Sequence, residues 1–109
     1  MRYQWVWEAE TEKEISQNAL DMAGQTIENI VEIVTEEAYK QTYIGLEEKA
    51  QEQGLTLENI SVYVDVAYSS VEKLDLEYAR LRMAPPEMTL FYKLQTRVYA
   101  YFDSEKPLM

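Results

Sequence analysis

The sequence predicts an α+β fold, in which one long helix, whether straight, bent or broken, packs on a mainly antiparallel sheet of three to four strands in the order β-α-β-β-β. Three observations predict it. Apolar and polar side chains alternate near the N-terminus and again in the second half, as they do in half-buried strands. Residues 11–53 instead carry apolar side chains at helical spacing and contain no proline. A chain of 109 residues can bury one core, so we expect residues 1–109 to form a single α+β domain.

The first strand is expected at residues 2–10. Tyr3, Trp5 and Trp7 fall on one side of this segment, whereas Val6 and Glu8 fall on the other. Alternation together with aromatic enrichment favours a strand. We expect the two tryptophans to belong to the core.

A long helix is expected next, from Thr11 to about Gln53. Thr11 has a residue type that caps helix N-termini, and Glu14 stands three positions later, as in a capping box. Gly54 suits the position just past a helix C-terminus.

The apolar side of this helix changes direction partway along. In the first half the apolar residues share one broad face that ends at Glu37. In the second half they line up over nearly the opposite side; these residues are Tyr39, Tyr43, Leu46 and Ala50. Forty-odd helical residues would extend about 60 Å, while a ten-residue strand covers only about 33 Å. Since residues 35–37 contain no glycine or proline, we expect a continuous or merely bent helix whose second stripe docks on a partner.

The other strands follow Gly54. Residues 60–68 alternate cleanly, with Val62, Val64, Val66 and Tyr68 on one face, and residues 88–102 form the last strand. Residues 71–83 fit a strand or a helix. We favour the strand, with residues 84–87 and their two prolines as the loop of a long hairpin that pairs Leu74 with Arg97.

That hairpin would place many aromatic side chains on the sheet face turned away from the helix. The residues expected there as a partner interface are Tyr63, Tyr78, Phe91, Tyr99 and Tyr101. Tyrosine is enriched at protein interfaces, and so much aromatic area seldom faces water alone. The sequence therefore predicts a non-catalytic protein-interaction module that forms a homodimer through this face and the second helical stripe.

Residue types that support most enzymatic chemistry are missing. The chain has no histidine and no cysteine, which excludes Ser-His-Asp and Cys-His sites, ordinary zinc ligands and disulfides. The pairs at residues 36–37 and 47–48 are adjacent glutamates on a helix, so their side chains point about 100° apart and do not converge on one ion. We expect no catalytic residue, no cofactor and no metal.

The charge of the chain restricts its partners. Its net charge is −10, and residues 1–58 hold 13 acidic and 4 basic side chains. Such a chain repels phosphates, so we expect no direct binding to nucleic acid or to a membrane surface. The sequence has no apolar run near the ~18 residues of a membrane helix and no signal-peptide pattern. We expect a soluble, cytoplasmic protein.

Two alternative functions remain open. Glu28, Glu32 and Glu36 recur every four residues, about 6 Å apart along a helix axis, as in an inhibitor that mimics nucleic acid. Such a protein, borne by a virus or plasmid, would bind the basic surface of a nucleic-acid-handling enzyme. The second alternative is a small-molecule binder with a pocket lined by Trp5, Trp7 and Tyr92.

Overall fold

The computed structural model describes residues 2–107, and it confirms the α+β class. Its elements are β1 (Tyr3–Ser16), α1 (Gln17–Ala23), α2 (Ile27–Glu52), β2 (Glu58–Leu74), α3 (Leu76–Arg82) and β3 (Met88–Ser104). The three strands are antiparallel in the order β1-β3-β2. The element order along the chain is therefore β-α-α-β-α-β, because the predicted long helix is two helices and part of the predicted third strand is a helix.

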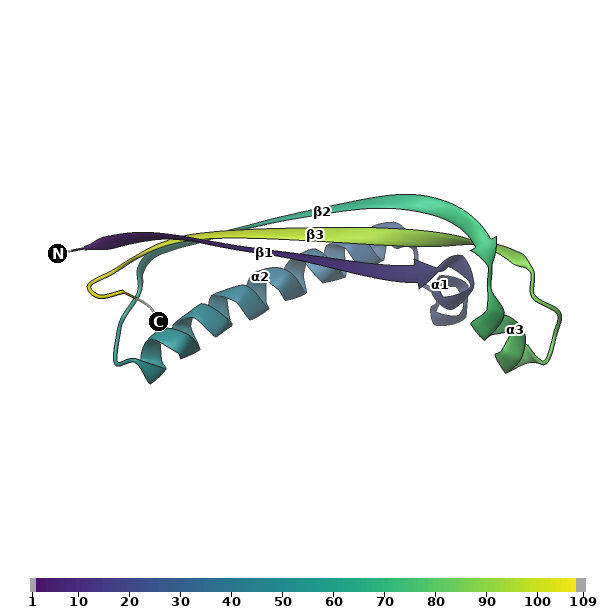
Figure 1. Cartoon of the computed structure of the whole chain (residues 1–109), viewed down its shortest axis with the longest axis horizontal. Helices are drawn as coiled ribbons and strands as arrows, with labels where there is room; N and C mark the ends of the chain where they lie inside the picture. Colours follow the sequence, from purple (N-terminus) through teal and green to yellow (C-terminus); the bar gives the residue numbers. More distant parts are fainter. Residues whose placement is uncertain (1, 108–109) are drawn as a thin grey trace.

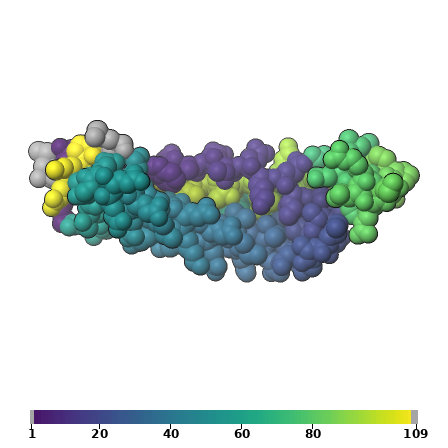
Figure 2. Space-filling model, turned by 90° about the horizontal axis from the view of Figure 1, so that it is seen from below, coloured from purple at the N-terminus to yellow at the C-terminus, as the bar shows by residue number. Residues whose placement is uncertain are grey.

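The molecule is a long two-layer ribbon. All three helices lie on one side of the sheet, and no helix or loop covers the other side of the described chain (Figure 1). Its principal extents are 63 × 23 × 21 Å. Seen from the helix side, α2 lies along one long margin and β1 along the opposite one, with β3 visible between them (Figure 2). α2 accordingly packs on β2 and β3 rather than on β1.

The core follows the central strand. Every second side chain of β3 from Leu94 to Phe102 is buried on the helix side. Leu94 packs with Leu20 of α1 and Ile27 of α2 near one end. Phe102 belongs to a second cluster near the other end, which also contains Leu46, Val62, Val98 and Ala100. The alternation that predicted the last strand therefore also marks the core face correctly.

β1 continues well past the predicted helix start at Thr11. It runs to Ser16, and Thr11 pairs with Thr96 of the central strand. The helix begins only after Ser16, whose side chain accepts a hydrogen bond from the Ala19 N–H at 3.1 Å. Thr11 and Glu14 have the spacing of a capping box, but pairing with the whole length of β3 outweighs that local preference.

The long helical segment breaks at residues 24–26, and it is continuous through residues 35–37 as predicted. Gly24 ends α1 with φ 65°, in the left-handed region where glycine has no steric penalty. Thr26 then caps α2, since its side chain accepts the Asn29 N–H at 3.2 Å.

Replacing Thr26 by alanine is expected to lower the free energy of unfolding by about 1 kcal/mol, because the Asn29 N–H then loses its cap. Urea denaturation measures this change. Thr56→Ala removes the same atoms from an exposed position in the loop before β2 and serves as the control. Equal losses in the two variants would show that the cap contributes nothing.

Both apolar stripes of α2 face the same sheet, so the expectation that one sheet can satisfy only the first stripe is wrong. Ile30, Val31 and Val34 pack on the Leu94 cluster, while Leu46 lies in the Phe102 cluster. Strands twist along their length, so a long helix that stays in contact must turn its side chains progressively. The helix also does not overshoot: 26 residues of α2 extend about 39 Å, and 17 residues of β2 or β3 about 56 Å.

The favoured strand at residues 71–83 is wrong beyond Leu74. β2 ends there, and Leu74 pairs with Met88 rather than Arg97. Asp75 caps α3 by accepting the Tyr78 N–H at 2.9 Å, and Met83 ends this helix in the left-handed region. Local capping thus converts an ambiguous pattern into a helix and removes Tyr78 from the sheet.

Candidate functional site

The face of the sheet turned away from the helices, called the open face below, carries four of the five predicted aromatic residues. Tyr63 lies beside Tyr99 in the sheet register, and its ring meets that of Tyr101 edge to face at 5.9 Å between centroids. These three tyrosines line a shallow hollow of about 380 Å³. Phe91 lies on the same face at the far end, where the Lys73 Nζ is 4.4 Å from its ring centroid. Tyr78 is on α3 and does not join them.

The second helical stripe, predicted as a partner interface, lies partly in the core and partly at the surface; its residues are Tyr39, Tyr43, Leu46 and Ala50. Leu46 and Ala50 are buried within the chain, so these two predicted interface residues already have their contacts. Tyr43 is half-buried, and Tyr39 stacks on it with ring centroids 6.3 Å apart. Tyr39 keeps 46% of its surface exposed and remains free to contact a partner.

The position of Tyr39 and Tyr43 on α2, relative to β1 and β2, follows from the contacts of neighbouring helix residues. Ala50 lines a small hollow with Leu55 and Leu57, in the loop that leads into β2. Trp7 of β1 instead faces the side of α2 that holds Thr42 and Gly45. Tyr39 and Tyr43 lie on the same helical stripe as Ala50, at spacings of 11 and 7 residues. They therefore lie along the β2 side of the molecule.

The two outer strands carry their charged side chains at different places along their lengths. β2 and β1 are both sheet edges in the described chain. Residues 60–71 of β2 contain one charged side chain, Asp65. Residues 8–14 of β1 contain five, which are Glu8, Glu10, Glu12, Lys13 and Glu14. Charge on an edge strand opposes pairing with another strand, so residues 8–14 of β1 are protected and residues 60–71 of β2 are not.

Exposed tyrosines surround the unprotected edge. Tyr63 on the open face is 59% exposed, and Tyr68 on the helix side is 46% exposed although its ring meets Tyr92 at 5.9 Å. We call residues 60–71, which include Tyr63 and Tyr68, together with Tyr39 of α2, the β2 margin. Sequence reasoning missed Tyr68 because its alternation with Val64 and Val66 assigned it to the core. The shortage of charge at residues 60–71 was the available signal.

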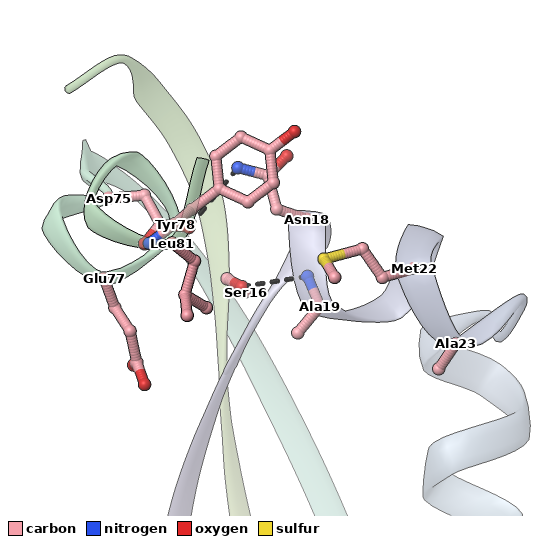
Figure 3. Close-up of a pocket in the computed structure, with 9 residues that line it drawn as sticks. All are labelled: Ser16, Asn18, Ala19, Met22, Ala23, Asp75, Glu77, Tyr78 and Leu81. Carbon is pink, nitrogen blue, oxygen red and sulfur yellow. Dashed lines mark hydrogen bonds between the residues drawn. The ribbon is translucent and has the colours of Figure 1, made fainter. Parts of the chain in front are cut away.

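A groove between α1 and α3 has the size of a ligand pocket but little chemistry. Its volume is about 420 Å³, and its lining residues are Ser16, Asn18, Ala19, Met22, Ala23, Asp75, Glu77, Tyr78 and Leu81 (Figure 3). The Asp75 carboxylate accepts the Tyr78 N–H at 2.9 Å and the Asn18 side-chain amide at 3.3 Å. Both of its oxygens are thus engaged, and Glu77 points away from Met22 in Figure 3. Asp75 therefore holds α3 against α1.

The pocket expected between Trp5, Trp7 and Tyr92 is not formed. Trp5 donates to the Ser104 hydroxyl at 3.1 Å, whereas the Tyr92 hydroxyl donates to Gln17 at 2.9 Å near the opposite end of the sheet. No group of three or more acidic side chains could hold a metal ion in the part of the chain that is described. Among residues 2–107, no helix is long and apolar enough to cross a membrane.

The predicted acidic stripe is fully at the surface. Glu28, Glu32 and Glu36 are all exposed on α2, and none of them forms an ion pair with another described residue. The ion pairs present are exposed ones: Arg2 with Glu58, Lys73 with Glu14, and Arg97 with Glu10 at 3.7 Å. Such pairs contribute little to stability.

No protein-family model, curated protein or solved structure matches this chain.

Proposed function

We propose that this protein is a non-catalytic interaction module that forms a homodimer through the β2 margin. The observation that carries the proposal is the contrast between the two sheet edges. One edge is charged at five of seven consecutive positions, and the other has a single charge in twelve. Charge on an edge strand opposes pairing with another strand, so the less charged stretch is the one that tolerates a partner.

The side chains around this edge suit a protein interface. Interfaces are enriched in tyrosine and depleted in Lys, Glu and Asp at their centres. Tyr39, Tyr63 and Tyr68 are all substantially exposed in the isolated chain. A rigid aromatic side chain loses little conformational freedom on binding, which makes such residues frequent sources of binding energy.

Electrostatics favours the same location. Two copies that each carry a net charge of −10 repel one another over most of their surfaces. Within residues 60–71, contact through β2 brings only Asp65 of each strand to the other copy, whereas contact through β1 would oppose two rows of glutamates. Association is therefore least unfavourable at β2.

Sedimentation equilibrium at micromolar concentration is expected to give twice the chain mass of 12.8 kDa. Raising the salt from about 50 to about 500 mM is expected to tighten the dimer on the order of tenfold, because salt screens the repulsion between the copies. A monomer at both salt concentrations would refute the proposal. A complex with a basic protein that weakens with salt, and weakens further when Glu28, Glu32 and Glu36 become glutamine, would instead support the inhibitor alternative.

A further inference from the structure

We infer that the second copy adds to the sheet itself, with the two β2 strands antiparallel about a twofold axis at Val64. The dimer then contains one continuous six-stranded sheet in the order β1-β3-β2-β2-β3-β1, with both α2 helices side by side beneath it. This inference rests on the proposed self-association and specifies its geometry.

The backbone of β2 provides the first reason. Its inner edge is hydrogen-bonded to β3, and no strand of the described chain pairs with its outer edge. The outward N–H and C=O groups can bond to a second strand with no change in the fold. A twofold axis perpendicular to the sheet joins two identical edges in the antiparallel sense, which makes the contact self-complementary.

The side chains select the register. With Val64 on the axis, Val64 meets its own copy, and Val62 meets Val66 of the second copy on the helix side. On the open face, Tyr63 lies opposite Asp65 of the second copy. Moving the axis by one residue to Asp65 would place two carboxylates directly opposite each other. Moving it to Ala67 would place Val62 opposite the charged Glu72.

The helices are compatible with this arrangement. α2 packs on β2 and β3, so its axis lies about one strand spacing from the dimer axis, and the two α2 axes are about 10 Å apart. Packed helices are typically 8–10 Å apart. Ala38 and Val64 pack against the same core cluster, so the middle of α2 is level with the twofold axis. Tyr39 then lies near that axis, and the acidic halves of the two antiparallel helices, residues 28–36, point to opposite ends.

The area is sufficient for a stable dimer. A contact about 39 Å long, the length of α2, and 23 Å deep, the intermediate extent of the molecule, spans about 900 Å² per copy. That is the usual size of a specific interface.

Single-cysteine variants test the geometry cleanly, because the chain has no cysteine of its own. Val64→Cys is expected to form a disulfide-linked dimer under mild oxidation, since residues opposite each other in antiparallel strands have Cα atoms about 4.5–5.5 Å apart. Gln95→Cys, on the open face of the central strand, and Glu10→Cys, on the β1 edge, are the controls and should remain unlinked.

Mixing two single-cysteine variants tests the register of the two β2 strands independently. Tyr63→Cys mixed with Asp65→Cys is expected to cross-link, whereas each alone should not, because the diagonal distance of about 7–8 Å exceeds the disulfide range. A dimer that cross-links through Gln95→Cys and not through β2 is joined face to face; this overturns the edge inference while homodimer formation stands. A strictly monomeric protein would refute both.

Discussion

Replacing Leu94 by alanine is expected to lower the free energy of unfolding by about 2–5 kcal/mol. Leu94 is 1% exposed on the central strand, and it contacts the cluster that joins Leu20 of α1 and Ile27 of α2 to the sheet. Truncation removes buried apolar surface and leaves a cavity between three elements. Urea denaturation at a fixed protein concentration measures the loss.

Leu81→Ala is the matched control for this prediction. It makes the same chemical change at a leucine that is 71% exposed on α3. The expected loss is below about 0.5 kcal/mol, as for other exposed substitutions. Similar losses in the two variants would contradict the placement of the core on the helix side of β3.

The two-residue alternation predicted much of this fold because it records which face each strand buries. It located the strand at residues 60–68 and nearly all of the last strand, and it placed Tyr63, Tyr99 and Tyr101 together on the open face. It also gave the α+β class. These features depend on the period of side chains along one strand, which neighbouring elements do not change.

The errors arose where long-range pairing or a cap decided the outcome. Thr11 and Glu14 look like a helix start, but the full length of β3 was available to pair with them. Asp75 has the residue type of a helix cap, yet the alternation around it favoured a strand, and its capping bond to Tyr78 became evident only in three dimensions. Gly24, by contrast, is a break that the residue type itself indicates, since glycine favours the left-handed conformation in which α1 ends.

The candidate site could not be recognised without the order of the strands in the sheet. The low charge of residues 60–71 can be read from the sequence, but its meaning depends on β2 being an outer strand. In the centre of a sheet the same composition is ordinary. The order β1-β3-β2 turns a weak compositional signal into an unprotected edge.

Placing charge in the β2 margin is expected to separate the dimer. The double variant Tyr39→Glu with Tyr63→Glu should raise the dimer dissociation constant by more than about 100-fold, equivalent to about 3 kcal/mol. Twofold symmetry places both new carboxylates of each copy at the contact, where they replace aromatic surface and repel their counterparts. Sedimentation across a range of concentrations measures the constant. Both tyrosines are exposed in the single chain, so the monomer should remain folded, as circular dichroism would show.

The control must add the same charge elsewhere. Met22→Glu with Leu81→Glu changes two exposed apolar residues at the groove between α1 and α3 and should leave the dissociation constant within a few fold. Tyr101→Glu distinguishes the mode of association, because Tyr101 lies on the open face one strand inside the edge. A dimer joined face to face would lose affinity on Tyr101→Glu as much as on Tyr63→Glu. A dimer joined along β2 depends on Tyr39 and Tyr63, and it keeps most of its affinity when only the central strand is charged.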